Sequence, residues 1–593
     1  MTITSRILES NLSIRKPRSR AGPYHIGDQV RVYAAGGAFG LAKPGMPSQD
    51  CSMNDFDYII VGGGSAGSVL AERLSSDPAC KVLLVEEGGD GDSFVIKMPK
   101  GFGKTLTDPA TAHFYPTVRS RDDGAGQEVW VRGKMLGGSS GVNGMVWNRG
   151  VAADYDRLAD LAGEQWSWAH MQRIFLSLED HASGPSADRG VGGPIRVKTH
   201  PAPSPLLNAW LAAGSEMGLP IKSDHSDPRQ EGIGPLQWNI DAKGRRVSAA
   251  RGFLAKARNR PNLKIETGVR TDRVLLEGRR AVGIAGIRSD GAKVEFRCGG
   301  EVILSAGAIG SPRILQLSGI GGVKDLQRAG IEVALDCPGV GHHMREHNLV
   351  MMNFRLRHRR DSANDQFTGA RLLANVAKHV MGLNNTMSFG SSEAAAFVKV
   401  LPESERPDSQ LMFAPYSLDM AAGMAMEAEP GMQVFSMTLR PRSEGHVLVT
   451  SSDPAAMLNI DPNFMSDDYD RRAAIGQFRF IREMMAKAPL KEFVVGETDF
   501  TAQARSDDDI IDLFNRYGSA GYHATATVRM GMDNSAPLDG RLRLRGIDGL
   551  RVVDCSVFPE MVAGNTNAPT MGMAMRAAEL IQEDRRAASV RAA

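Results

Sequence analysis

The chain has 593 residues, of which 42% are hydrophobic and 23% charged, and its formal net charge is +2 at pH 7. This is the composition of an ordinary globular protein that is long enough for two domains. So small a net charge gives no basis for a nucleic-acid partner. No apolar run reaches the roughly 18–20 residues that span a bilayer, so no transmembrane segment is expected.

The cysteines and the N-terminal segment bear on the compartment. The five cysteines are scattered and include no C-x-x-C pair. This pattern disfavours a disulfide framework and a structural zinc site, and it fits the cytoplasm. Residues 1–52 are basic and contain no apolar core of a secretory signal. We expect them to form a disordered or non-native leader outside the fold.

The folded sequence begins with a strand, a glycine-rich loop and a helix. The apolar run Tyr58–Val61 predicts a strand buried on both faces of a parallel sheet. The loop Gly62–Gly67 follows it and leads into a helix predicted for Ser68–Leu74. A second strand is predicted for Lys81–Val85, and Glu86 closes it. This arrangement is typical of an adenine dinucleotide site.

Each part of this unit has a physical role. Gly62 permits the tight turn, Gly64 lets the backbone approach a pyrophosphate, and Gly67 lets the helix pack on the sheet. The helix N-terminus attracts phosphates, and Glu86 can accept hydrogen bonds from ribose hydroxyls. The fingerprint does not distinguish FAD from NAD. Its candidate dinucleotide contacts are Gly62, Gly64, Ser65, Ala66, Gly67 and Glu86.

Four ordered blocks carry a resemblance over most of the chain. The blocks are Asp55–Gly89, Arg132–Met145 (the first signature), Ser305–Pro312 with Ser318–Gly321 (the second signature), and Tyr522-His523 with Gly564–Thr570 (the C-terminal block). Together they resemble the glucose–methanol–choline (GMC) oxidoreductase family, nearest its choline and primary-alcohol dehydrogenase branch. The resemblance implies FAD as the cofactor.

The resemblance also implies the fold. We expect the α/β class, mixed α+β overall, with a Rossmann-like FAD-binding domain and a substrate domain built on an antiparallel sheet and helices. The FAD-binding domain would be discontinuous and comprise residues 54–155, 240–345 and 510–593. The substrate-binding domain would comprise residues 156–239 and 346–509.

Further FAD contacts follow from the same resemblance. Asn143, Gly144 and Met145 are expected at the edge of the flavin ring, and Thr271 is expected near the adenine. Family members that attach FAD covalently through the first signature have a His directly before its Asn. Here Val142 precedes Asn143, so we expect non-covalent FAD. The remaining candidates are Arg132, Gly138, Asp554, Asn567 and Thr570.

Alcohol oxidation needs a base for the hydroxyl proton and transfer of the α-hydride to flavin N5. The family places a His beside a second His or an Asn for this purpose, and these positions correspond to His523 and Asn565. A neutral imidazole suits a base that works near pH 7, and the amide can orient the alkoxide oxygen. The family commonly has Gly three positions after the His, where this chain has Ala526.

We therefore expect an FAD-dependent alcohol dehydrogenase or oxidase that acts on CH–OH donors. Its electron acceptor would be O₂ or a quinone-type carrier, and it would lie in the cytoplasm or at a membrane surface that holds such a carrier. The sequence does not indicate which alcohol is the substrate. An FAD-containing lyase of the same fold, which cleaves cyanohydrins with a structural flavin, is the alternative.

Two short patterns point to a hydrolase, a less favoured alternative. The segments Gly63–Gly67 and Gly137–Gly141 match G-x-S-x-G, and His343–His347 matches the zinc-peptidase pattern H-x-x-E-H. The first segment overlaps the dinucleotide loop, and the second does not follow an apolar strand. The third lacks an apolar helical face, so Glu346 and His347 are expected to form a buried pair and no metal is expected.

Overall fold

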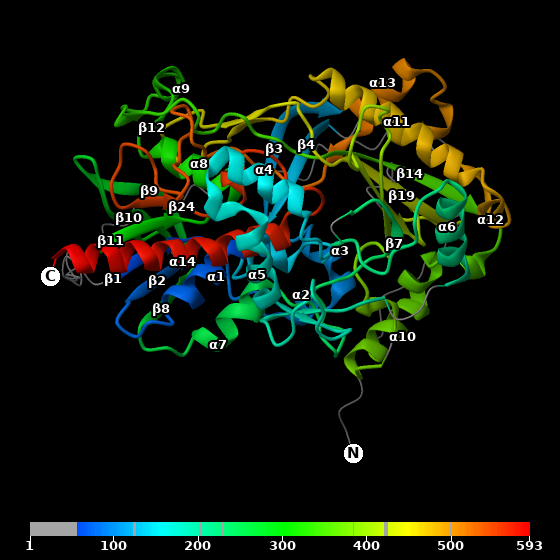
Figure 1. Ribbon diagram of the computed structural model, residues 1–593, viewed down its shortest axis with the longest axis horizontal. Helices are drawn as coiled ribbons and strands as arrows, with labels where there is room; N and C mark the ends of the chain where they lie inside the picture. The colour runs from blue at the N-terminus through cyan, green and yellow to red at the C-terminus, as the bar shows by residue number, and fades with distance from the viewer. Residues whose placement is uncertain are drawn as a thin grey trace, which may run out of the picture. The chain divides into compact units, whose positions relative to one another are not determined.

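The predicted apolar strand lies at the centre of a parallel sheet in the computed structural model (Figure 1). The structure describes residues 56–121, 126–200, 204–227, 229–383, 385–419, 425–498 and 500–592, and the predicted leader lies outside them. Strands β1 (Phe56–Val61) and β2 (Val82–Glu86) are parallel and almost wholly buried. The sheet order is β8-β2-β1-β11, with β24 beside β11. The predicted Rossmann-like half of the fold is confirmed.

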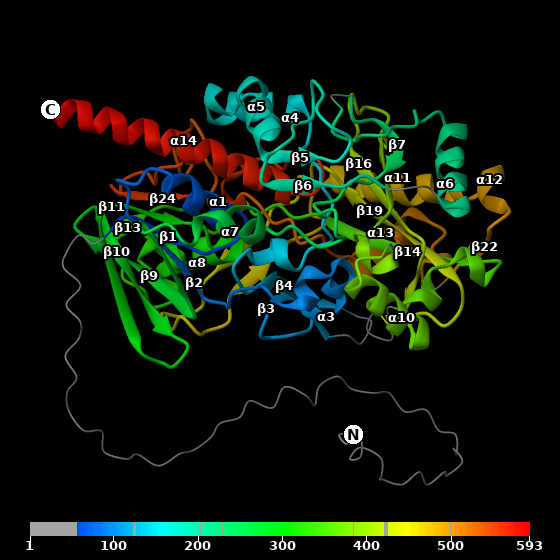
Figure 2. The ribbon, with the colours of Figure 1, turned by 90° about the horizontal axis from the view of Figure 1, so that it is seen from below.

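Helix α1 (Ser65–Leu74) begins three residues earlier than predicted, directly after Gly64. Its first turn therefore belongs to the glycine-rich loop, and its free backbone N–H groups lie at the end of β1. The C-terminal helix α14 (Asn567–Ala592) packs along α1 (Figures 1 and 2). The first and last helices of the chain thus cover the same part of the parallel sheet.

Strand β11 (Lys293–Leu304) joins the parallel sheet to an antiparallel extension. Its first half pairs with β10 (Arg280–Arg288), which pairs in turn with β9 (Val269–Glu277), and its second half pairs with β1. Figure 2 shows this extension projecting beside the sheet.

A second, antiparallel sheet forms the other half, as predicted. Its order is β22-β14-β19-β16-β15-β7. Because side chains alternate along a strand, one face of β14 (Asn348–Leu356) and β19 (Gly431–Thr438) packs on helices through residues such as Met352 and Val434. The opposite face of the same strands presents Met351 and Gln433 to a large cavity. The helices on the packed face are α6 (Pro205–Glu216), α11 (Asp468–Met485) and α13 (Asp507–Tyr517).

We propose one shift of the expected boundary between the two halves. Helices α4 (Ala152–Ala162) and α5 (Trp168–Leu178) and the strands that follow them fall mostly within residues 156–239, which were assigned to the substrate domain. Phe175 and Leu178 are fully buried in the same hydrophobic core as β1 and α14. We therefore propose that residues 156–197 belong with the FAD-binding half, because their apolar side chains are buried there.

No helix in the described ranges is long and apolar enough to cross a membrane. The remaining elements either complete the two large sheets, as β7, β8, β15, β16, β22, β23 and β24 do, or lie outside these sheets. Their bounds are α2 Phe94–Lys97, α3 Phe102–Thr105, α7 Ala255–Ala257, α8 Gly307–Leu317, α9 Val323–Arg328, α10 Gly369–Val380, α12 Ala488–Lys491, β3 Ala112–Arg121, β4 Gly126–Gly133, β5 Glu179–His181, β6 Ile195–Val197, β7 Gly232–Pro235, β8 Leu263–Thr267, β12 Ile320–Gly321, β13 Leu335–Asp336, β15 Ala394–Val398, β16 Ser409–Ala414, β17 Leu418–Asp419, β18 Ala425–Met426, β20 His446–Leu448, β21 Asn459–Asp461, β22 Val494–Glu497, β23 Ser519–Ala520 and β24 Leu550–Val552.

Candidate active site

A cavity of about 1110 Å³ is lined by the glycine-rich loop, both signature segments, the open face of the antiparallel sheet and the C-terminal block. With one exception, all the residues expected to contact FAD or substrate line this cavity. The exception is Gly67, which faces the loop. A Cβ on Gly67 would overlap the carbonyl oxygen of Gly62, so glycine is required there for close packing of helix and loop.

Gly64 differs from Gly67 because it borders open space. A Cβ built on Gly64 would have one neighbouring atom within 4 Å, the Cα of Gly138 at 3.9 Å. Gly62 has a φ of +98°, which supplies the tight turn. The space beside Gly64 and the start of α1 fit the pyrophosphate of a dinucleotide.

The side chain of Glu86 is hydrogen-bonded to backbone amides of the protein, one of them in the glycine-rich loop. Its Oε2 accepts a hydrogen bond of 2.8 Å from the Gly63 amide, and its Oε1 accepts one of 2.8 Å from the Gly88 amide. Burial raises the pKa of this carboxyl to about 7. Each carboxylate oxygen has a second lone pair, so the predicted contact with ribose hydroxyls stays a prediction.

Four predicted contact residues have buried polar atoms with no hydrogen-bond partner among the described residues. These atoms are Arg132 Nη2, Thr271 Oγ1, Asn565 Oδ1 and Asn567 Nδ2, and all four residues line the cavity. The Ser65 hydroxyl donates a 2.8 Å hydrogen bond to Asn567 Oδ1 and so joins the loop to the C-terminal block. Buried polar atoms normally have hydrogen-bond partners. The atoms without one are therefore suited to contact a bound group with many polar atoms, as FAD has.

The segment expected at the flavin edge, Asn143–Met145, is held by hydrogen bonds from Arg246, a residue that the sequence did not single out. Arg246 Nη1 donates to the carbonyl oxygen of Asn143 at 2.7 Å and to its Oδ1 at 2.8 Å. Asn143 Oδ1 also accepts from the Met145 amide at 3.1 Å, and Met145 has a φ of +63°. No motif marks Arg246, because it acts across about a hundred residues.

Asp554 and Thr570 line the cavity, but their side chains are bonded within the protein. Asp554 Oδ2 accepts from the Gly307 amide at 2.9 Å and from the Ser311 hydroxyl at 2.6 Å. It thereby links the second signature to the segment that directly follows β24. Thr570 Oγ1 donates to the carbonyl oxygen of Thr566 at 2.7 Å.

The two predicted catalytic residues meet in this cavity. Asn565 Nδ2 lies 3.3 Å from His523 Nε2. On the other side of the ring, His523 Nδ1 lies 2.9 Å from Nδ1 of His347, whose Nε2 lies 3.1 Å from the carbonyl oxygen of Leu439. His347 is fully buried, and burial lowers its pKa to about 4, so the ring is neutral at pH 7.

These contacts fix which nitrogen of His523 carries the proton. A carbonyl oxygen can only accept, so His347 Nε2 holds the single ring proton and its Nδ1 is an acceptor. His523 Nδ1 must then donate to His347 Nδ1. The lone pair of His523 therefore sits on Nε2 and faces Asn565, which presents its NH₂ group.

The surroundings of His523 keep it neutral and hold its backbone in place. Burial, with smaller effects of His347 and Arg132, lowers the pKa of His523 well below 6.5. Tyr522 and Ala526, on either side of it, have φ values of +61° and +66°, a left-handed conformation that is strained for residues with a Cβ. This conformation explains why the resembling family commonly has Gly at the position of Ala526.

Glu346 supports the same segment. Its Oε1 accepts from the backbone amides of His523 at 2.7 Å and His347 at 2.9 Å, and its Oε2 lies 3.5 Å from Arg132 Nη2. Arg132 also lies over the ring of Tyr522 at 5.4 Å. Burial raises the pKa of the Glu346 carboxyl to about 7, against the lowering effects of Arg132 and the two amides.

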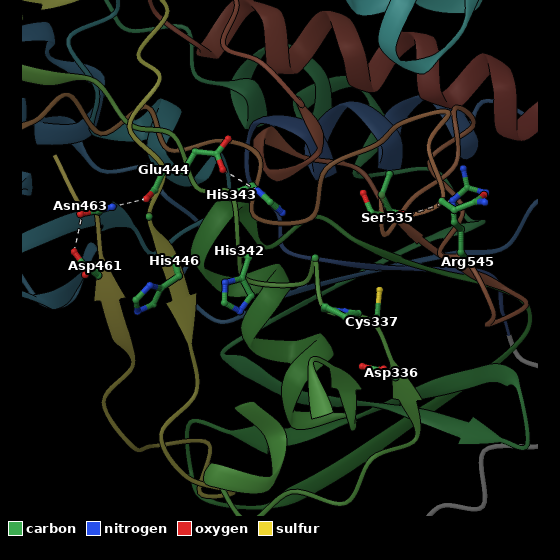
Figure 3. A pocket seen from close by; sticks show the side chains of 15 residues that line it. Asp336, Cys337, His342, His343, Glu444, His446, Asp461, Asn463, Ser535 and Arg545 are labelled. Atoms are coloured by element: carbon green, nitrogen blue, oxygen red, sulfur yellow. Dashed lines mark hydrogen bonds and ion pairs between the residues drawn. The ribbon is translucent and has the colours of Figure 1, made fainter. Parts of the chain in front are cut away.

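The patterns that suggested a hydrolase are not assembled into hydrolase sites. His343 Nδ1 lies 2.8 Å from Glu444 Oε2 in a second pocket (Figure 3). Both ring nitrogens of His347 are engaged elsewhere, and no group of three or more His, Cys, Asp or Glu residues in the described ranges is arranged to hold a metal. Ser65 donates to Asn567, and Ser139 Oγ accepts from the Gly133 amide at 3.2 Å, so neither serine is bonded to a histidine.

Comparison with known proteins identifies the family. Residues 56–349 and 441–574 match the N- and C-terminal models of GMC oxidoreductases. The chain is 35% identical to an oxygen-dependent choline dehydrogenase of Ectopseudomonas mendocina (strain ymp) and 36% identical to one of Pseudomonas fluorescens (strain Pf0-1), in each case over 89% of this chain and 94% of the relative.

Solved structures of other proteins are similar to this chain over most of its length. Pyridoxine 4-oxidase from Mesorbium loti superposes with a TM-score of 0.79 at 29% identity, covering 89% of this chain and 99% of that one. A formate oxidase superposes with a TM-score of 0.82 at 25% identity, covering 90% and 99%. The chain belongs to the GMC oxidoreductase family and is an FAD-dependent oxidoreductase that acts on CH–OH donors.

Proposed function

We propose that this protein oxidises an alcohol to the carbonyl compound, with His523 as the base that removes the hydroxyl proton. The observation that supports it most directly is the contact between His347 and His523. Because His347 can only accept from His523 Nδ1, the basic lone pair is held on Nε2, on the side of Asn565 and the cavity. A base must be neutral and directed at the proton that it removes. The lowered pKa of His523 and the position of its Nε2 beside Asn565 support this role.

The proposed role of Asn565 is to stabilise the negative charge that develops on the substrate oxygen. One N–H of its amide points to His523 Nε2, and the other, which has no acceptor among the described residues, can donate to the substrate oxygen. As the proton moves to Nε2, negative charge develops on that oxygen, and the amide stabilises it without competing for the proton. The hydride acceptor in this chemistry is the FAD that the family binds.

FAD is proposed to be bound without a covalent link to the first signature. Val142, where a histidine would be needed, is buried against Ile96 and Met135 and offers no nucleophile. We propose O₂ as the electron acceptor, because the names of the relatives include an oxygen-dependent dehydrogenase and two oxidases. A quinone-type carrier is the other electron acceptor to test. Choline is one of the alcohols to test as substrate.

Anaerobic mixing of the holoenzyme with a panel of alcohols tests this proposal. Oxidation of an alcohol bleaches the flavin absorbance and yields one carbonyl product per flavin, and readmitted O₂ restores the colour with formation of H₂O₂. A lyase that uses flavin only as a structural group would cleave a cyanohydrin with no bleaching. Absence of bleaching with every alcohol would contradict the proposal.

A further inference from the structure

We propose that Lys100 selects alcohols that carry a carboxylate at the end remote from the reacting hydroxyl. The inference rests on the proposed function, since it concerns the substrate of the same site. Lys100 lies in the short helical turn Pro99–Gly101 and lines the cavity that also contains His523. No pattern in the sequence singles it out.

The ammonium group of Lys100 lies in an aromatic corner. Its Nζ is 4.6 Å from the centre of the Tyr416 ring and 5.4 Å from that of Phe367, and these two rings meet edge to face with their centres 5.5 Å apart. Aromatic faces attract cations. Here they hold the protein's own cation, so they are not available to bind the cationic end of a substrate.

Lys100 is also close to the segment expected at the flavin edge. Its Nζ donates a long hydrogen bond of 3.4 Å to the carbonyl oxygen of Ser391. The Ser391 hydroxyl lies 3.5 Å from the carbonyl oxygen of Gly144, and a Cβ on Gly144 would overlap that hydroxyl. A substrate that extends from His523 along this segment would lie close to Lys100.

The hydrogen-bonding capacity of the ammonium is mostly unused. An ammonium has three donors, and in the described part of the chain Ser391 is the acceptor bonded to Nζ, with no carboxylate within 4.0 Å. The nearest influence of opposite charge is Glu393, which contacts His200 at 3.6 Å. Burial lowers the pKa of Lys100 to about 8, so the group remains mostly protonated at pH 7.

Gln433 provides a further polar group that lines the same cavity. Its side chain is fully buried on the open face of β19, and neither amide atom has a partner among the described residues. Met351 and Phe435 lie on the same face of the sheet as Gln433, and Met412 also lines the cavity. The Lys100 ammonium, the Gln433 amide and these apolar side chains fit an alcohol with an aliphatic body and a single carboxylate, and they disfavour a quaternary ammonium alcohol.

The test compares matched alcohols with the holoenzyme. The probes are ω-hydroxy monocarboxylates of four to eight carbons, their methyl esters, and trimethylammonium alcohols of similar length. We expect the carboxylates to have the highest kcat/KM for anaerobic flavin reduction. In Lys100→Met, the ratio of kcat/KM for a carboxylate to that for its ester should fall about 10- to 100-fold, mainly through KM, because a bond to a charged group is lost. Lys100→Glu should reverse the preference toward the trimethylammonium alcohols.

Two controls keep the outcomes distinct. Lys256→Met makes the same change of charge on an exposed residue that does not line the cavity, and it should leave the ratio unchanged. Titration of unreactive alkanoates, followed by the flavin spectrum, should show weaker binding in Lys100→Met than in the wild type. If neutral alcohols bleach the flavin but carboxylates have no advantage, or if Lys100→Met loses FAD, this inference is overturned while the proposed function stands. If no alcohol bleaches the flavin, the proposed function itself fails.

Discussion

The Nδ1 atoms of His347 and His523 lie 2.9 Å apart, although 176 residues separate them in the chain. Two neutral imidazoles in this arrangement must share one proton between these atoms, and the carbonyl oxygen of Leu439 decides which ring supplies it. His347 is therefore a positioning residue. It does not line the cavity, yet it determines which ring nitrogen of His523, the residue that does, carries the proton.

Replacement of His347 tests this relationship. In His347→Leu, the Nδ1–H of His523 loses its acceptor, and the ring is free to carry its proton on Nε2 instead. We expect flavin reduction to slow about fivefold, since one hydrogen bond of about 1 kcal/mol orients the base. In His347→Gln, the side-chain oxygen can accept from Nδ1, so the rate should recover in part. Equal, near-normal rates in both variants at full FAD content would refute the positioning role.

The same pair predicts how stability depends on pH. His347 titrates near pH 4 when folded, because burial lowers its pKa, but near 6.5 in the unfolded chain, and the pKa of His523 is also lowered. Between pH 6.5 and 4, the unfolded chain binds more protons, so stability falls as the pH falls, by up to about 1.4 kcal/mol per pH unit for each histidine. Thermal unfolding with excess FAD should show a shallower acid loss in His347→Leu than in the wild type. Parallel curves would count against the pKa assignment.

The glycine-rich loop offers a matched pair of substitutions. Gly64 borders open space beside Gly138, so Gly64→Val should fold but lose FAD, because the side chain takes the place of the pyrophosphate. Gly67 has no such space, so even Gly67→Ala should destabilise the folded protein. Flavin content after gel filtration and circular dichroism of the apoproteins distinguish these effects. A Gly64→Val protein that retains its flavin would contradict the placement of the phosphates.

The part of the site that the sequence predicted is the part carried by local patterns. The strand, loop and helix around Gly64 follow from short-range periodicity and turn chemistry, and the pairing of His523 with Asn565 followed from the family resemblance. His347, Arg246 and Lys100 act through contacts with residues far away in the chain. The H-x-x-E-H segment did draw attention to His347, and its predicted burial is confirmed, but the direction of its ring required the structure.

The domain to which residues 156–197 belong could not be predicted from the sequence for the same reason. Residues 156–197 contain ordinary amphipathic helices, and nothing in their sequence states which core their apolar faces join. Phe175 and Leu178 join the core of the parallel sheet because α14, from the far end of the chain, packs beside them.

The state of the cofactor is tested by precipitation with acid. We expect the purified protein to be yellow and to release intact FAD into the supernatant, because Val142 replaces the residue needed for attachment through the first signature. Absorbance and chromatography of the supernatant provide the measurement. Yellow colour that stays with the pellet would reveal a covalent link at another residue.

The central claim is that His523 is the base, and anaerobic stopped-flow reduction of His523→Ala tests it most directly. Without a positioned acceptor for the hydroxyl proton, the rate of flavin reduction should fall by roughly 10²–10⁴ while FAD stays bound. Asn565→Ala should slow reduction less, and the defects should be less than additive, since both residues act on one oxygen. A His523→Ala protein with full flavin content that is reduced at a near-normal rate would show that the base is another residue.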